Sequence, residues 1–336
     1  MMRRFSSTAV SVFDRQLKRR QREFALQLST SYYEYLREES NGNIVDRLDD
    51  INKSFPVALE LGSYRGDMYR RISSESENHK YHSNGGLVGG ILELIQTDIA
   101  EFALKGSSVD GSDSNTDDRK IINDTNHPAV KTSKLSFDEE DVFPFEDRSF
   151  DLVLSSLSLH WINDLPSALL QIKRVLKPDG AFIGSMFGGN TLKELRHCFY
   201  LAELERRGGF SPHASPLAKS SDIAGLMQDA GFNLPTIDID TITVSYPDAI
   251  SLMEHLVCMG EGSASINRQF AVGRDTFLSM ASIYQQLYGL DDGSVRATFE
   301  IIYIIGWRPD ASQPKACQRG SAKQSMRDAL GNEQLT

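Results

Sequence analysis

A short loop after an apolar run combines a carboxylate with two glycines, which suits it to holding a small polar molecule. The run Val57-Ala58-Leu59 leads into Glu60-Leu61-Gly62-Ser63-Tyr64-Arg65-Gly66. Glycine lets backbone N–H groups approach a ligand without a Cβ in the way, and a carboxylate at a strand end suits a cationic amino group. Taken alone, the loop is equally compatible with a plain turn shaped by Gly62 and Gly66.

The spacing of the glycines favours one nucleotide-like cofactor over another. The dinucleotide fingerprint GxGxxG requires glycine at positions 62, 64 and 67, but the chain has Tyr64 and Asp67 there. The S-adenosylmethionine loop, acid-x-Gly-x-Gly-x-Gly, fits at three of its four marked positions: Glu60, Gly62 and Gly66. Tyr64 occupies the fourth position, where the loop calls for glycine.

Two further acids follow the next strands in the order that such a site requires. Asp98 closes the strand candidate ILELIQ, where an acid can accept both hydroxyls of a ribose, although it can also cap the helix that follows. Glu139 belongs to the acidic cluster 138–141, where an acid can accept a hydrogen bond from an adenine amino group. The alternative for this cluster is a solvated run of charge. Three acids at three successive strand ends are more specific than any one of them.

His160 and Trp161 are the only catalytic candidates, because they follow the strand FDLVLS at an end that should face the cofactor. His160 is able to relay a proton and Trp161 to line a substrate pocket. The competing interpretation is a hydrogen-bonded histidine and a packed tryptophan that close the sheet. After the next strand, Gly188-Gly189 and Asn190 predict either a lid with Asn190 as helix cap or a tight strand-to-helix turn.

The elements around these residues alternate between strands and helices, which predicts βαβ units and a mostly parallel sheet of the α/β class. Lys177-Pro178-Asp179-Gly180 is a turn signal between a helix and a strand. The predicted strands cover residues 57–61, 91–96, 150–155, 181–187, 242–246 and 297–307, the last at or near an edge. The predicted helices cover residues 13–28, 44–53, 165–176, 191–207, 222–231, 248–259 and 272–288.

The ends and two polar segments fall outside this pattern. Residues 1–12 are rich in Arg and Ser and lack acids, which is typical of a mitochondrial or plastid transit peptide. Residues 73–86 and 106–128 lack apolar periodicity and are predicted to be surface insertions. The tail 308–336 is predicted to be disordered. The domain itself then spans residues 13–307.

Composition excludes several classes of protein. A net charge of −10 argues against broad, non-specific binding to nucleic acid. The seven histidines offer no HxD pair, so no metal site can be read from the sequence. No stretch approaches the ~18 apolar residues that a membrane-spanning helix requires.

Longer strings carry a family resemblance that covers roughly residues 13–307. FDRQLKRRQR, HWINDLP, MFGGNTLKELR, ERRGGFSPHASP, MGEGSASINR and EIIYIIGW, around a core of the type LPF…FDLV…LKPGG, resemble a class I S-adenosylmethionine methyltransferase. More narrowly, they resemble mitochondrial complex I assembly proteins related to bacterial malonyl-carrier-protein methyltransferases.

The resemblance implies a Rossmann-like, seven-stranded sheet with helices on both faces, and S-adenosylmethionine as cofactor. It implies Glu60, Gly62, Gly66, Asp98 and Glu139 as cofactor-binding residues, and no metal. It also implies a protein of the mitochondrial matrix, peripheral to the inner membrane, that works with other assembly factors.

Three functions follow as hypotheses. The first is an enzyme that hydroxylates an arginine on the quinone-proximal iron–sulfur subunit of complex I. The second is a non-catalytic assembly chaperone that has lost the cofactor, which Tyr64 favours because its ring can fill the space of the methionine moiety. The third is a carboxyl O-methyltransferase acting on a carrier protein.

Overall fold

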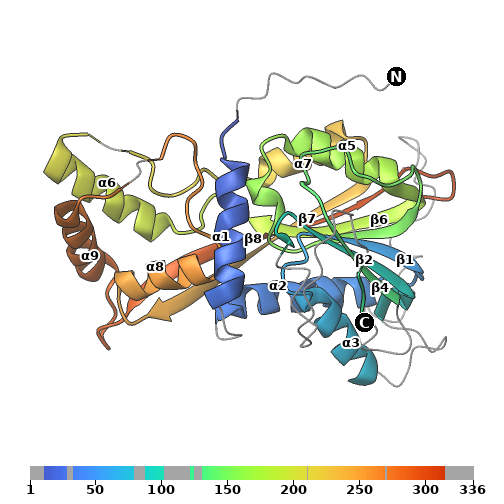
Figure 1. Ribbon diagram of the computed structural model, residues 1–336, viewed down its shortest axis with the longest axis horizontal. Coiled ribbons are helices and arrows are strands. Elements are labelled where there is room, and N and C mark those ends of the chain that lie inside the picture. Colours follow the sequence, from blue (N-terminus) through green and yellow to red (C-terminus); the bar gives the residue numbers. More distant parts are fainter. Residues whose placement is uncertain are drawn as a thin grey trace, which may run out of the picture.

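A single twisted sheet runs through the molecule, with helices on both faces (Figure 1). The computed structural model describes residues 11–28, 33–78, 88–101, 122–124, 131–209, 211–268 and 271–314. Within them the sheet has eight strands in the order β3-β4-β2-β1-β5-β6-β8-β7. The seven predicted by the resemblance are present, and β3 adds a short strand at the edge. The strands are β1 Val57–Leu61, β2 Glu93–Asp98, β3 Ile122–Asp124, β4 Lys131–Ser136, β5 Phe150–Ser155, β6 Leu176–Phe187, β7 Asn233–Tyr246 and β8 Val295–Trp307.

The centre of the sheet is parallel and its two edges are antiparallel. Strands β4, β2, β1, β5 and β6 run in the same direction, whereas β8 is antiparallel to β6 and β7, and β3 to β4. Strand order reverses between β1 and β5, because β1 pairs with β2 on one side and β5 on the other. Ligands of open α/β sheets bind beyond the carboxyl ends of the strands at this switch point. The loops after β1 and β5 therefore face the expected site.

Two layers of helices bury the two faces of the sheet in separate cores. Helices α2 and α3 pack on one face through residues such as Ile44 and Met68, and α5 and α7 pack on the other through Leu169 and Ile223. A third group, α6, α8 and α9, packs beside the extended half of β8 (Figure 1). The helices are α1 Arg15–Leu28, α2 Tyr35–Asp49, α3 Asp67–Asn78, α5 Leu165–Val175, α6 Lys193–Arg207, α7 Ser220–Asp229, α8 Ala249–Cys258 and α9 Arg274–Tyr288, with short 3-10 helices η2 Val88–Gly90 and η3 Leu159–Trp161.

Helix α1 stands in the middle of the molecule and contacts α8 (Figure 1). Its sequence, RQLKRRQREFALQL, is strongly basic, yet Lys18 and Arg22 are almost completely buried. Buried cations require carboxylates or carbonyl oxygens as partners. These partners come from the functional site.

Several predicted boundaries differ from the structure for local reasons. The turn expected at residues 177–180 lies inside β6, where the pairing with β5 shifts between Phe150 and Leu152 and Asp179 takes a positive φ of 60°. A bulge accommodates the turn residues without ending the strand. Helix α2 starts earlier than predicted and ends at Asp49, and β7 begins well before the predicted residue 242.

The segments predicted to lie outside the domain give a mixed result. Helix α3 runs into the predicted insertion 73–86 as far as Asn78, and β3 forms inside the predicted insertion 106–128. The other residues of these two insertions, 79–86, 106–121 and 125–128, lie outside the described residues. Part of the tail is held, since Arg308 Nη1 donates to the carbonyls of Lys173 and Arg174. Residues 1–10 and 315–336 lie outside the described part. No helix in the described ranges is long and apolar enough to cross a membrane.

Candidate functional site

The loop between β1 and α3 turns sharply because three of its residues adopt left-handed backbone conformations. Gly62, Tyr64 and Gly66 have φ values of 69°, 52° and 79°. A Cβ on Gly62 would lie 2.2 Å from Ser158 Oγ, so only glycine allows this close approach of the β1 and β5 ends. Tyr64 adopts the same left-handed region without that freedom, which costs a non-glycine residue about 1 kcal/mol.

Glu60 lies at the end of β1 with its side chain buried. Its Oε2 accepts a hydrogen bond from Gln96 Nε2 at 2.9 Å. Burial raises the pKa of Glu60 to about 8, and the bond from Gln96 only partly opposes this. The group is therefore largely protonated at neutral pH in this conformation, although the sequence suggested a carboxylate.

Asp98, at the end of β2, orders the loop from β1 and meets a cation. Its Oδ2 accepts from the backbone N–H of Tyr64 at 2.9 Å, and its Oδ1 accepts from that of Ala100 at 2.9 Å. Arg22 Nη2 of α1 lies 3.6 Å from Oδ2. The bond to Ala100 is the local contact that the helix-cap alternative predicted. Both carboxylate oxygens of Asp98 therefore accept hydrogen bonds from backbone N–H groups.

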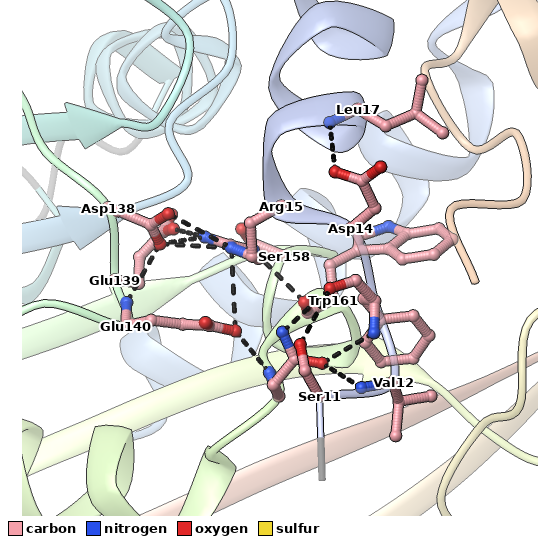
Figure 2. A network of polar contacts seen from close by, with 12 residues as sticks. Ser11, Val12, Asp14, Arg15, Leu17, Asp138, Glu139, Glu140, Ser158 and Trp161 are labelled. Atoms are coloured by element: carbon pink, nitrogen blue, oxygen red, sulfur yellow. Dashed lines mark hydrogen bonds and ion pairs between the residues drawn. The ribbon is translucent and has the colours of Figure 1, made fainter. Parts of the chain in front are cut away.

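Glu139, in the loop after β4, is paired with α1 as well. Arg15 Nη2 lies 2.5 Å from Glu139 Oε2 and 2.6 Å from Asp138 Oδ1, and Figure 2 shows this guanidinium between the acids and the Trp161 carbonyl. Burial raises the pKa of Glu139, whereas Arg15 opposes that rise. The acidic cluster is therefore more than a solvated run of charge, because α1 docks on it.

Tyr64 fills the space between these acids and α2. Only 2% of the residue is exposed, and its ring lies 4.6 Å from the Arg37 guanidinium and 5.9 Å from that of Arg22. Cations over an aromatic face are favourable contacts. No described residue hydrogen-bonds its Oη.

The chemistry of the site fits S-adenosylmethionine, but α1 and Tyr64 fill the space. The predicted acids converge at the switch point, and several buried polar atoms there lack a hydrogen-bond partner among the described residues: Arg22 Nη2, Ser63 Oγ, Tyr64 Oη and Glu139 Oε1. Such atoms are usually satisfied by water or a ligand. The cavity beside Tyr64, however, measures only about 20 Å³. A nucleoside-sized cofactor therefore requires α1 to move.

His160 and Trp161 share one partner that the sequence did not single out. His160 Nε2 lies 3.1 Å from Glu261 Oε2, and Trp161 Nε1 donates to the same oxygen at 2.8 Å. Burial lowers the pKa of His160. Burial alone would raise the pKa of Glu261, but His160 and Lys18 lower it to about 2. The pair at neutral pH is thus a neutral histidine donating to an ionised glutamate.

Glu261 follows α8 within MGEGSASINR, a string that served above only to recognise the family. The loop that carries it also binds a cation. Lys18 Nζ donates to the carbonyls of Gly260 and Gly262 at 3.0 and 2.8 Å and lies 3.2 Å from the centroid of the Trp161 ring. Burial lowers the pKa of Lys18 to about 7.

A cavity of about 620 Å³ lies beside this cluster, bounded by α1, α6, α8 and the ends of β6 and β8. Its wall includes His160, Trp161 and Glu261, and most of the remainder is apolar, including Phe187 and Phe199. The volume suits a small molecule or one long side chain. Within the described ranges, no group of three or more His, Cys, Asp or Glu side chains is placed to hold a metal ion.

The turn after β6 is pinned to β8. Asn190 Nδ2 donates to Glu300 Oε2 at 2.5 Å, and the backbone N–H of Gly188 donates to the Glu300 carbonyl. The residue before α6 is Leu192, with no side-chain cap, so the prediction of Asn190 as a helix cap is wrong. These contacts fit the tight strand-to-helix turn.

Comparisons with known proteins agree with this architecture. A model described as a methyltransferase domain matches residues 96–184. The protein named "Arginine-hydroxylase NDUFAF5, mitochondrial" from Danio rerio is 44% identical over 97% of this chain and 92% of its own length. The human protein of that name is also 44% identical, over 96% of this chain and 84% of its own.

The chain belongs to the NDUFAF5 arginine-hydroxylase family. The 44% identity covers 97% of this chain and 92% of the Danio rerio protein, whereas the methyltransferase-domain match covers only residues 96–184. A malonyl-[acyl-carrier protein] O-methyltransferase from Nitrosospira multiformis is 33% identical over 53% of this chain and 57% of its own. Among solved structures, the YcgJ protein from Bacillus subtilis gives a TM-score of 0.49 at 13% identity, covering 81% of this chain and 99% of that one.

Proposed function

We propose that this protein hydroxylates an arginine side chain of another protein during assembly of mitochondrial complex I. The observation that carries the proposal is the 44% identity to arginine hydroxylases across 97% of the chain. The geometry supports it, because an ionised carboxylate that is mostly buried, that of Glu261, borders a cavity next to the switch point of a methyltransferase-type sheet. The target is the quinone-proximal iron–sulfur subunit, as the sequence resemblance implies.

The cofactor belongs to the same proposal. S-adenosylmethionine binds where the three acid-bearing strands end, with Glu60, Gly62 and Gly66 around the methionine moiety, Asp98 at the ribose and Glu139 at the adenine. Its bound form would supply an activated methyl group at this edge of the sheet, which accounts for methyl transfer; hydroxylation in addition requires an oxidant that delivers one oxygen atom, which S-adenosylmethionine does not supply. Binding requires Arg15 and Arg22 to release Glu139 and Asp98, since both acids now face these cations. Other assembly factors are partners.

The location follows from the family and from the target. The family is mitochondrial, and we place the protein in the matrix at the inner membrane, where the iron–sulfur subunit is assembled. The net charge of −10 argues against broad, non-specific binding to nucleic acid.

The test is mass spectrometry of the iron–sulfur subunit from cells that contain or lack this protein. The expected result is a peptide whose arginine is heavier by one oxygen atom only when the protein is present. A shift of one methyl group instead would identify a methyltransferase. An unchanged subunit mass in both cell lines would refute the enzymatic function.

A non-catalytic assembly chaperone is the second candidate, and one specific observation favours it. Tyr64 is buried where the cofactor loop calls for glycine, and only about 20 Å³ of cavity remains beside it. Calorimetric titration with S-adenosylmethionine separates the candidates. Absence of binding at millimolar cofactor, together with an unmodified subunit, would favour the chaperone.

A further inference from the structure

The side chain of Glu261 lines two neighbouring cavities. Together with Phe187 it lines both the 620 Å³ cavity and the small cleft beside Tyr64. Its Oε2 is fixed by His160 and Trp161, whereas Oε1 accepts no hydrogen bond from any residue in the part of the chain that the structure describes. One carboxylate oxygen is thus held in place and the other is left for a ligand.

The charge state of this cluster is set by its surroundings. The pKa of Glu261 is lowered to about 2, so its carboxylate is ionised at any physiological pH. The pKa of His160 is lowered by burial, so the imidazole is neutral there and donates from Nε2. The ring therefore orients the carboxylate without neutralising it.

The remainder of the cavity suits the aliphatic part of a long cationic side chain. Apolar groups of Leu195, Phe199, Leu256 and Phe299 form much of its wall. An apolar cavity with an ionised carboxylate at one side is complementary to a cation carried on a methylene stem. A guanidinium suits it better than an ammonium, since it is less strongly hydrated and offers paired donors to a carboxylate.

We propose that Glu261 receives the guanidinium of the arginine that this protein modifies, while the arginine stem lies in the adjoining cavity. The inference rests on the proposed function and deepens it by naming the substrate-recognition residue. His160 and Trp161 are positioning residues, because they hold Oε2 and leave Oε1 toward the substrate. The site lies against the cleft beside Tyr64, so a bound guanidinium would be next to the cofactor end of the sheet.

The cations already present are compatible with this assignment. Arg196 and Arg268 also line the cavity, but their guanidiniums donate to backbone carbonyls of Thr191 and Ser265. Lys18 is the cation nearest the glutamate loop, and its pKa of about 7 lets it lose its proton when a second cation approaches. Arg37 of α2 lines the small cleft together with Glu261, and its guanidinium donates to the Ser156 carbonyl.

Two ligands of the same shape test the inference in the full-length protein. N-α-acetyl-arginine methylamide and its neutral counterpart N-α-acetyl-citrulline methylamide are titrated while tryptophan fluorescence is recorded. The fluorescence of Trp161 should change when a ligand binds at Glu261, because its indole N–H donates to that side chain. The titrations use a Trp307→Phe background, which removes the other tryptophan. The arginine compound should bind about tenfold more tightly than the citrulline compound.

Glu261→Gln should abolish this preference, because the amide keeps the shape and loses the charge. Glu194→Gln is the matched control, because Glu194 is a buried glutamate bonded to Thr298 and neither of these two residues lines the cavity. The control variant should prefer the arginine compound over the citrulline compound by the same factor as the natural protein. Equal binding of the two ligands by the natural protein, no binding of either at 10 mM, or an intact preference in Glu261→Gln would each overturn the inference.

The result separates this inference from the proposed function. Binding needs no turnover, so a preference that depends on Glu261 would stand even if the iron–sulfur subunit gained no oxygen. Conversely, a Glu261→Gln protein that restores the full oxygen shift in cells would refute the role of Glu261 and leave the hydroxylase function intact.

Discussion

At the scale of single residues, Tyr64 occupies the position where the cofactor loop calls for glycine. Its ring fills the space beside Asp98, and its backbone takes a left-handed conformation that glycine adopts without strain. Relief of that strain is worth about 1 kcal/mol. Loss of a buried aromatic side chain, however, typically costs about 3–5 kcal/mol.

Tyr64→Gly should therefore lower the free energy of unfolding by about 2–4 kcal/mol and at the same time create space for the cofactor. We expect the variant to bind S-adenosylmethionine more tightly than the natural protein, measured by calorimetry, with stability measured by urea unfolding. Tyr64→Phe is the control, because Oη has no described partner and its removal should leave both quantities nearly unchanged. Weaker cofactor binding by Tyr64→Gly would show that the ring is part of the cofactor site.

The sequence identified the residues at the strand ends but not their partners. Glu60, Asp98 and Glu139 were found because each follows an apolar run, and such ends meet at one edge of a parallel sheet. Glu261 was missed, since it lies 101 residues from His160 in a loop with no strand before it. Its pairing with His160 and Trp161 is created by tertiary packing alone.

At the scale of elements, α1 is the part of the fold that packs over the predicted cofactor acids. Arg15 binds Asp138 and Glu139 (Figure 2). Arg22 faces Asp98, so one helix covers two of the predicted cofactor acids. The sequence predicted a helix over residues 13–28, and α1 covers Arg15–Leu28. It did not predict where the helix docks, because the acids that bind Arg15 are more than a hundred residues away in the sequence.

Arg15→Ala should loosen α1 and strengthen cofactor binding. Removal of one partner from a buried ion pair typically destabilises a protein by about 3–5 kcal/mol, and here Glu139 is left without its cation. Hydrogen exchange of the α1 amides should accelerate, and the affinity for S-adenosylmethionine should rise about tenfold as the open state becomes more populated. Arg19→Ala on the same helix is the control, since that side chain is 43% exposed and its pair with Glu23 contributes little. Equal effects of the two substitutions would contradict a gating role for Arg15.

Elements were predictable in proportion to their apolar patterning. The strand FDLVLS was predicted to the residue because it is buried and continuous. Strand β4 was missed because KTSKLS has no apolar run, although Thr132, Ser133 and Lys134 are buried beside β2. The turn residues KPDG lie within β6, where they form a bulge in the pairing with β5 and do not end the strand.

At the scale of the whole molecule, two buried groups should shape the dependence of stability on pH in opposite directions. Glu60 has a pKa of about 8 in the folded protein, against an ordinary value of 4.5, so the folded state binds more protons between these limits. Stability contributed by Glu60 is present below pH 4.5 and is lost as pH rises toward 8. Lys18 has a pKa of about 7, against 10.5, so the unfolded state binds more protons between those limits. Its contribution rises as pH increases from 7 to 10.5.

The summed contribution of Glu60 and Lys18 to the free energy of unfolding is lowest near pH 7–8. In this range most of the stability contributed by Glu60 has been lost, and little of that contributed by Lys18 has been gained. Each group changes the free energy of unfolding by up to about 1.4 kcal/mol per pH unit in its own window. Glu60→Gln should remove the decline between pH 5 and 8, and Lys18→Met should remove the rise between pH 7 and 10. Urea unfolding at intervals of one pH unit measures both, with each variant compared with the natural protein so that all other groups cancel. A difference curve for Lys18→Met that is flat from pH 7 to 10 would mean that Lys18 keeps an ordinary pKa and that α1 is not docked in solution as it is here.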